Sequence, residues 1–150
     1  MRRGSRVGVI LLLTLGVLAV PLKAQGSSGE KEPPGRESGF RLGQNYPNPF
    51  DPETRIPFEL SPKYFENGQK PVVTIKIYNI LQQLVAIPVA LNHPEGSGVK
   101  VDRLVYHSPG PAEAYWDGRD RNGNKVPSGV YILQMDVNGE KRTIRMHIAR

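Results

Sequence analysis

Apolar and polar residues alternate along several short segments between residues 54 and 148. Ile56, Phe58 and Leu60 would share one face of a strand, with Arg55 and Glu59 on the other face. The same alternation recurs in three further apolar sets: Val73, Ile75 and Ile77; Tyr131, Leu133, Met135 and Val137; and Ile144, Met146 and Ile148. No segment in this range has a helical period. The pattern predicts an all-β fold, an antiparallel β-sandwich of about seven short strands.

Two segments with weaker patterns complete the expected set. Residues 84–89 read as one strand with Val85, Ile87 and Val89 on its apolar face. Pro88 makes this an edge strand, because proline cannot donate a hydrogen bond to a neighbouring strand. Residues 99–106 change their apolar phase midway, which indicates a bulge or an added strand.

The stretch from Trp116 to Val137 combines the largest apolar residue with a run of turn formers. Asp117-Gly118, Asn122-Gly123 and Pro127-Ser128-Gly129 all favour tight turns. Asn-Gly between two apolar runs is a strong hairpin signal. We therefore expect two strands joined by a long ordered loop, with Trp116 as the largest single contribution to the core.

The N-terminal residues resemble an export signal. Arginines precede an apolar run at residues 7–20, and Ala24 offers a small residue for cleavage, which predicts a signal peptide over 1–24. An uncleaved membrane anchor is the alternative, but the run is shorter than the roughly 20 residues that span a bilayer. Residues 25–42 read as a flexible linker and 43–150 as the folded domain.

Composition narrows the compartment and the partners. The chain has no cysteine, so an exported form has no disulfides and no lipoprotein anchor. Four of its 20 basic residues and none of its 14 acidic residues lie in the predicted signal peptide. The net charge of +6 therefore falls to +2 in residues 25–150, and gives no argument for nucleic-acid binding.

Proline interrupts the chain just before the first alternating strand. Tyr46-Pro47-Asn48-Pro49-Phe50 and Pro52 exclude both a helix and a central strand. We expect an extended segment at a sheet edge, with Tyr46 and Phe50 as apolar anchors.

Five short motifs together resemble one protein family. They are Tyr46-Pro47-Asn48-Pro49-Phe50, Ile77-Tyr78-Asn79-Ile80-Leu81, Trp116-Asp117-Gly118-Arg119-Asp120, Asn122-Gly123 and Ser128-Gly129-Val130-Tyr131. In this order they resemble the type A C-terminal sorting domain of the bacterial type IX secretion system. That domain is similar to the immunoglobulin-like domain of the flagellar hook-capping protein FlgD. The resemblance covers residues 43 to 150.

The resemblance implies an immunoglobulin-like sandwich that serves as an address. Such domains are read by outer-membrane secretion machinery, chiefly through the closing strand, here residues 141–150. The expected recognition residues are therefore the basic side chains of that strand, Lys141, Arg142, Arg145 and Arg150. The implied partner is this machinery or another envelope protein, and anionic surface polysaccharide is a further candidate. The implied location is the periplasm, then the cell surface or the medium.

Three departures from the family pattern leave alternatives open. Gln82 stands where the family often has glycine, so its turn must differ or carry strain. Residues 92–111 are longer than usual and read as an extra hairpin. No cargo precedes the domain, so it is the delivered protein, a remnant of a longer chain, or a structural or adhesive envelope module. In the last case Pro88 and residues 92–111 would form the contact surface.

Candidate catalytic and metal-binding chemistry is sparse. The loop carrying Asp117, Asp120, Asn122 and Asn124 lacks the glycine and glutamate of a calcium-binding EF-hand, so its aspartates are expected to fix turns. His93, His107 and His147 are widely spaced and are expected to be solvated. Without cysteine, a nucleophile-elbow serine or a phosphate-binding glycine motif, the sequence predicts no enzyme and no cofactor.

Overall fold

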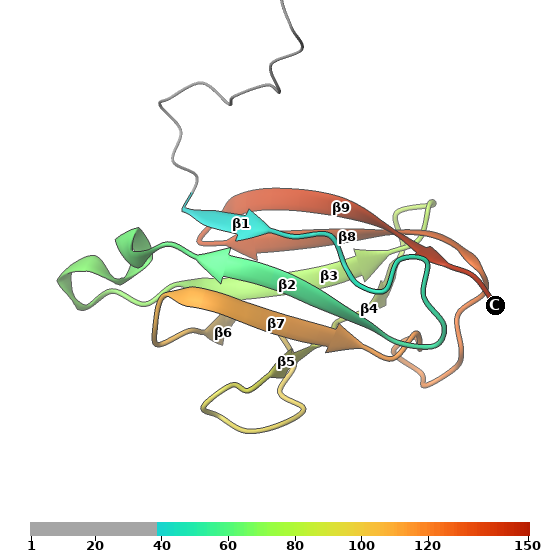
Figure 1. Cartoon of the computed structure of the whole chain (residues 1–150), viewed down its shortest axis with the longest axis horizontal. Helices are drawn as coiled ribbons and strands as arrows, with labels where there is room; N and C mark the ends of the chain where they lie inside the picture. Colours follow the sequence, from blue (N-terminus) through green and yellow to red (C-terminus); the bar gives the residue numbers. More distant parts are fainter. Residues whose placement is uncertain (1–38) are drawn as a thin grey trace, which may run out of the picture. The chain divides into compact units, whose positions relative to one another are not determined.

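Two antiparallel sheets face each other in residues 39–150, the part of the chain that the computed structural model describes (Figure 1). The predicted signal peptide and most of the predicted linker lie outside these residues. The nine strands are β1 (Phe40–Leu42), β2 (Thr54–Leu60), β3 (Val72–Tyr78), β4 (Leu84–Ala86), β5 (Val89–Leu91), β6 (Leu104–Val105), β7 (Gly110–Trp116), β8 (Gly129–Val137) and β9 (Glu140–Ile148). A 3₁₀ segment, η1 (Pro62–Gly68), follows β2.

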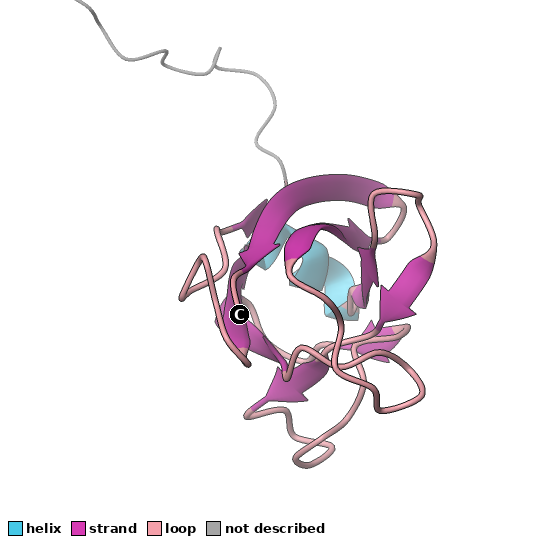
Figure 2. Cartoon of the chain, turned by 90° about the vertical axis from the view of Figure 1, so that its right-hand side faces the viewer, coloured by secondary structure: helices cyan, strands magenta, loops and turns pink. Residues whose placement is uncertain are grey.

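The strand order confirms the all-β sandwich. One sheet has the order β1-β2-β7-β5, and the other has the order β4-β3-β8-β9, with β6 pairing with part of β3. We call them sheet A and sheet B. Seen end-on, the strands curl around a common interior (Figure 2). Within the described residues, no helix is long and apolar enough to cross a membrane.

The apolar sets predicted from the alternation fill this interior. In β2, β3 and β8 every predicted inward residue is buried. In β9, Met146 and Ile148 are buried and Ile144 packs against the core. Trp116 is only 2% exposed. The period-two pattern therefore predicted which face of each long strand enters the core.

The two strands and the long ordered loop predicted around Asn122-Gly123 are confirmed, because β7 and β8 flank residues 117–128, but these two strands do not pair as a hairpin. β7 and β8 belong to different sheets, and the loop between them carries the chain across the sandwich. Asn122-Gly123 forms only a local turn, in which the Gly123 N–H donates to the Asp120 carbonyl at 3.0 Å. The tight hairpin is formed instead by Asn138-Gly139 between β8 and β9, with φ of 52° and 92°. Those angles match the type I′ turn that Asn-Gly favours.

The single strand expected at residues 84–89 is also wrong. The chain forms β4 in sheet B, then crosses at Ile87-Pro88 and forms β5 in sheet A. Ala86 and Ala90 are buried, so the inward residues lie one position out of the predicted phase. Small alanines between larger apolar residues concealed this phase, because valine and isoleucine dominate a hydrophobicity pattern.

The structure also places the start of the folded domain and the added strand within residues 99–106. The folded domain begins before residue 43, because β1 pairs with β2 and Phe40 is buried in the core. Residues 99–106 contain the predicted added strand, β6, and Arg103 takes a φ of 50° where the apolar phase changes. The insertion is thus integrated into the sandwich, since Val101, Leu104 and Tyr106 are all buried.

Candidate interaction surface

The closing strand β9 lies at the edge of sheet B and has two different faces. Lys141, Thr143, Arg145 and His147 are exposed, as predicted. Lys141 and Arg145 point to the same side, because side chains alternate along a strand. Among the described residues, neither takes part in an ion pair. These two cations are the part of the predicted recognition set that the structure brings together on an open surface.

Arg142 lies on the opposite side of β9 from those two residues. Its guanidinium carbon is 5.3 Å from the centre of the Phe40 ring, in a cation–π arrangement. Its Nη2 is 3.3 Å from the Glu140 carboxylate. Arg142 is only partly exposed and joins β9 to β1 across the side of the sandwich. Its recognition role stays a prediction, and the contacts that the structure shows for it lie within the chain.

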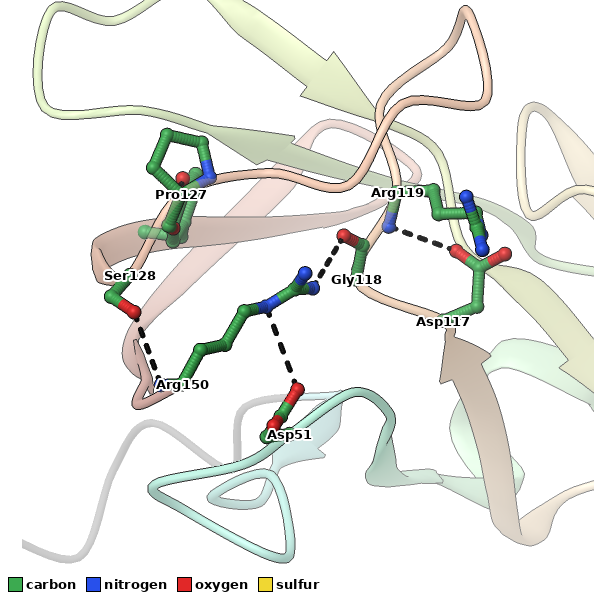
Figure 3. A network of polar contacts seen from close by, with 8 residues as sticks. Asp51, Asp117, Gly118, Arg119, Pro127, Ser128 and Arg150 are labelled. Carbon is green, nitrogen blue, oxygen red and sulfur yellow. Dashed lines mark hydrogen bonds and ion pairs between the residues drawn. The ribbon is translucent and has the colours of Figure 1, made fainter.

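Arg150 is held by three residues from two parts of the chain, the β7–β8 loop and the proline-rich segment at residues 46–52 (Figure 3). Its backbone N–H donates to Ser128 Oγ at 3.1 Å, and its Nη2 donates to the Gly118 carbonyl at 3.2 Å. Its Nε lies 3.5 Å from an Asp51 carboxylate oxygen. The last residue therefore fastens the end of the chain to the β7–β8 loop and to the proline-rich segment. It does not extend freely with Lys141 and Arg145.

The proline-rich segment covers the outer edge of β9 near the C-terminus. The Phe50 N–H donates to the His147 carbonyl at 3.0 Å, and the Ala149 N–H donates to the Phe50 carbonyl at 3.2 Å. Asn48 Oδ1 accepts from the His147 N–H at 2.9 Å. Gln44 Nε2 donates to the Arg145 carbonyl at 2.9 Å. These bonds occupy edge groups that a partner strand would otherwise use.

Of the two residues expected to anchor the proline-rich segment in the core, Tyr46 and Phe50, only Phe50 is buried. Phe50 is buried, as predicted, and its ring meets Trp116 edge-on with centroids 5.5 Å apart. Tyr46 is 46% exposed, which contradicts the prediction. Its hydroxyl donates to the Glu113 carboxylate, and this bond raises the pKa of Tyr46. Tyrosine suits a partly exposed position of this kind, because its ring is apolar and its hydroxyl is polar.

Three of the motifs that resemble the sorting-domain family, at residues 46–50, 116–120 and 128–131, meet at one end of the sandwich. Trp116 lies between Phe50 and Tyr131, whose centroid is 5.6 Å away, and its Nε1 donates to the Arg119 carbonyl at 2.8 Å. The Tyr131 hydroxyl donates to the Pro127 carbonyl at 2.8 Å. Gly118 has no room for a side chain, because a Cβ would lie 2.3 Å from the Pro52 carbonyl oxygen. These motif residues therefore build and close the end that holds the C-terminus.

The aspartate-rich loop is fixed by its own backbone, as predicted. Asp120 Oδ1 accepts from the N–H groups of Asn122 and Asn124 at 2.8 and 2.9 Å. These bonds, that of Asn124 first, lower the pKa of Asp120. Asp117 Oδ1 accepts from the Arg119 N–H at 3.0 Å. Within residues 39–150, no cluster of three or more acidic or histidine side chains could hold a metal ion.

The prediction that all three histidines are solvated is wrong for His93, which is 6% exposed. Its Nε2 lies 3.0 Å from the Val105 carbonyl, and its Nδ1 accepts from the Glu95 N–H at 3.2 Å. The ring also contacts Tyr106, with centroids 4.9 Å apart. His93 thus stabilises the 92–111 segment, and sequence spacing gave no sign of it because Val105 and Tyr106 are distant in the chain.

The turn between β3 and β4 presents two exposed apolar residues, Ile80 and Leu81, for which the sequence predicted no contact role. Asn79 Oδ1 accepts from the Leu81 and Gln83 N–H groups at 3.0 and 2.9 Å. Gln82 takes a left-handed φ of 61°, which confirms the expected strain at this position. Ile80 and Leu81 are each 73% exposed at the tip. Two adjacent aliphatic residues beside a turn were the feature of the sequence from which this exposed apolar surface could have been predicted.

Comparisons with known proteins support the fold. No family profile matches the sequence, and no curated protein sequence matches it either. Two solved structures from Porphyromonas gingivalis are similar over 73% of this chain. Dimeric latent PorU has 19% identity and a TM-score of 0.50. PorZ, described as an essential surface component of the type IX secretion system, has 20% identity and a TM-score of 0.42.

The matched region is a small part of both larger proteins. This chain spans 9% of the PorU chain and 11% of the PorZ chain. At such identities the likeness to PorU shows a shared fold.

Proposed function

We propose that this chain is an exported, non-catalytic domain that is recognised by contact, as a C-terminal sorting domain of the type IX secretion type is. The observation that carries the proposal is the closing strand β9, an edge strand that presents Lys141 and Arg145 without ion-pair partners among the described residues. The strand fixes the positions of these two residues on the surface, and their charges are free to pair with a partner.

Two observations support the proposal. Three of the five resemblance motifs, at residues 46–50, 116–120 and 128–131, meet around Trp116 and Arg150. The fold is also similar to part of PorU. The proposed partner is outer-membrane secretion machinery or another envelope protein.

Of the four predicted recognition residues, we propose Lys141 and Arg145 as the ones that contact the partner. Arg142 and Arg150 make intramolecular contacts that stabilise the fold, so we assign them to stability. Removing residues 141–150 would also remove Met146 and Ile148 from the core, and loss of export would then report only unfolding.

Charge reversal at the exposed positions separates recognition from folding. We expect Lys141→Glu/Arg145→Glu to leave the free energy of unfolding within about 1 kcal/mol, since surface charges contribute little. We expect the same variant to accumulate in the periplasm instead of reaching the surface. Lys70→Glu, an exposed substitution outside sheet B, is the matched control. Cell fractionation with immunodetection is the measurement, and normal surface delivery of the double variant would refute the proposal.

The alternative function, a structural or adhesive envelope module, placed its contact surface at Pro88 and residues 92–111. Pro88 is buried, and Val101 and Tyr106 belong to the core. The Ala90 N–H donates to the Val99 carbonyl at 2.7 Å, so residues 99–101 cover this edge of β5. These contacts favour the sorting function over an adhesive hairpin at that place.

A further inference from the structure

The outward faces of the two sheets differ in their charge. On sheet A, Arg55 lies 3.4 Å from the Glu113 carboxylate, and Arg41 stands opposite Glu59 in the register. On sheet B, the outward side chains of β3, β8 and β9 form a surface that we call the basic face. They are Val72, Thr74, Lys76, Tyr78, Val130, Ile132, Gln134, Asp136, Lys141, Thr143, Arg145 and His147.

The basic face carries three cations and one carboxylate. Lys76, Lys141 and Arg145 form no ion pair within residues 39–150. The carboxylate, Asp136, uses Oδ1 to accept from the Gly139 N–H at 2.8 Å. Among the described residues, sheet A has an outward ion pair between Arg55 and Glu113, whereas the three cations of the basic face have none, although Lys141 stands opposite Asp136 in the register.

One end of the basic face is concave and is lined by both apolar and polar side chains. Tyr78, Ile132 and Arg145 stand side by side in one row across three strands, as the register shows. Together with residues of the β3–β4 turn they line a concavity of about 770 Å³. That volume lies in the range of small-molecule pockets, about 300–1,000 Å³. Its remaining lining residues are Asn79, Ile80, Gln82, Val130, Gln134 and His147.

The turn beside the concavity extends its apolar surface. Ile80 lines the concavity, and its neighbour Leu81 is equally exposed. The Asn79 side chain holds the turn in place through two backbone hydrogen bonds and a third bond to Gln83 Oε1 at 2.8 Å. A fixed apolar projection costs less entropy to bind than a flexible one.

We propose that the basic face binds an acidic protein segment that inserts an apolar side chain between Tyr78, Ile80 and Ile132, with its carboxylates on Lys76 and Arg145. This proposal rests on the proposed function and names the chemistry of the partner. An apolar anchor surrounded by complementary charges is the usual arrangement of a protein interface.

Two other occupants fit the basic face less well. A second copy in a symmetric dimer would set Lys76, Lys141 and Arg145 against the same cations, which is repulsive. An anionic polysaccharide would satisfy the cations but would leave Ile80 and Leu81 without apolar contact. Charge and apolar surface together favour a protein segment.

A titration with synthetic peptides tests the proposal. The exported chain, purified as the host processes it, is titrated with a peptide of alternating glutamate and leucine. Amide NMR shifts and calorimetry are recorded at low and at physiological salt. We expect shifts concentrated at Tyr78, Ile80, Ile132 and Arg145. We expect a glutamate–serine peptide, and the Ile80→Ser/Leu81→Ser variant with the first peptide, to bind at least about ten-fold more weakly.

Controls separate the possible outcomes. Lys70→Glu should bind like the native chain, and Lys76→Glu/Arg145→Glu should lose binding. Equal affinity for both peptides, or for dextran sulfate, would overturn the proposal in favour of charge alone. If Ile80→Ser/Leu81→Ser reaches the cell surface normally while Lys141→Glu/Arg145→Glu does not, the anchor is refuted and the sorting function stands. If both variants reach the cell surface normally, the apolar anchor and the sorting function are both refuted.

Discussion

At the scale of single residues, Trp116 is the centre of the end that holds the C-terminus. It is buried between two aromatic rings and donates one hydrogen bond to the backbone. We expect Trp116→Ala to lower the free energy of unfolding by about 3–5 kcal/mol, the range for large-to-alanine core substitutions. Denaturant unfolding measures it. The neighbouring Tyr115→Ala, on the outward face, should cost less than about half as much; equal losses would contradict the packing described.

Tyr106 carries a buried polar group that lowers the stability of the folded state. Its hydroxyl is buried and finds no partner among the described residues. Burial raises the pKa of Tyr106 to about 12. Since the folded state keeps a proton that an unfolded tyrosine loses near pH 10, this residue's contribution to stability is complete below pH 10 and is lost as the pH rises towards 12.

The matched variant is Tyr106→Phe. We expect it to raise the free energy of unfolding at neutral pH by about 1 kcal/mol, because an unpartnered buried hydroxyl is removed. Stability should also fall less steeply between about pH 10 and 12, by up to about 1.4 kcal/mol per pH unit. Chemical unfolding across this pH range is the measurement. A destabilised variant with an unchanged alkaline slope would show that the hydroxyl has a partner.

At the scale of elements, the β7–β8 loop depends on where its glycines lie. Gly118 and Gly123 both have positive φ, 71° and 84°, but only Gly118 faces a neighbouring backbone. We expect Gly123→Ala to cost about 1 kcal/mol from its backbone angle alone. Gly118→Ala should cost at least about 2 kcal/mol more, because Pro52 must move. Thermal unfolding of the pair measures this difference, and equal costs would show that the proline-rich segment is not held against the loop.

Sequence patterns predicted long strands well and connections poorly. β2, β3, β8 and β9 each have enough alternating residues to fix which face is buried, so their core sets follow directly. β4 and β5 have three residues each, too few to show an alternating pattern. Each pairs in a different sheet because the chain crosses between the sheets at Ile87-Pro88. The hairpin error has the same origin: Asn122-Gly123 and Asn138-Gly139 offer the same turn chemistry, and only tertiary pairing decides which one joins two strands.

The candidate site was predicted in composition but not in arrangement. The basic residues of the last strand were identified, but Phe40 and Asp51 drew Arg142 and Arg150 into intramolecular contacts. Such contacts cross about a hundred positions of sequence, and no local pattern reports them. Ile80 and Leu81 remained unassigned because a turn has no period from which exposure can be inferred.

At the scale of the whole molecule, sheet A and sheet B present different outward surfaces. Sheet A and the Trp116 end close the fold through paired charges and aromatic contacts. Sheet B leaves cations and a concavity open on its outward face. This difference between the two faces is consistent with the proposed recognition by contact, in which the open face would be the one that meets a partner.

The most direct measurement of the central claim uses a reporter enzyme inserted between residues 35 and 36 of the full chain. The chain is expressed in a bacterium that has a type IX secretion system, and reporter activity is compared between periplasm and cell surface. The account predicts activity at the surface for the native domain and in the periplasm for Lys141→Glu/Arg145→Glu. Reporter activity confined to the periplasm, with the native domain folded, would contradict it.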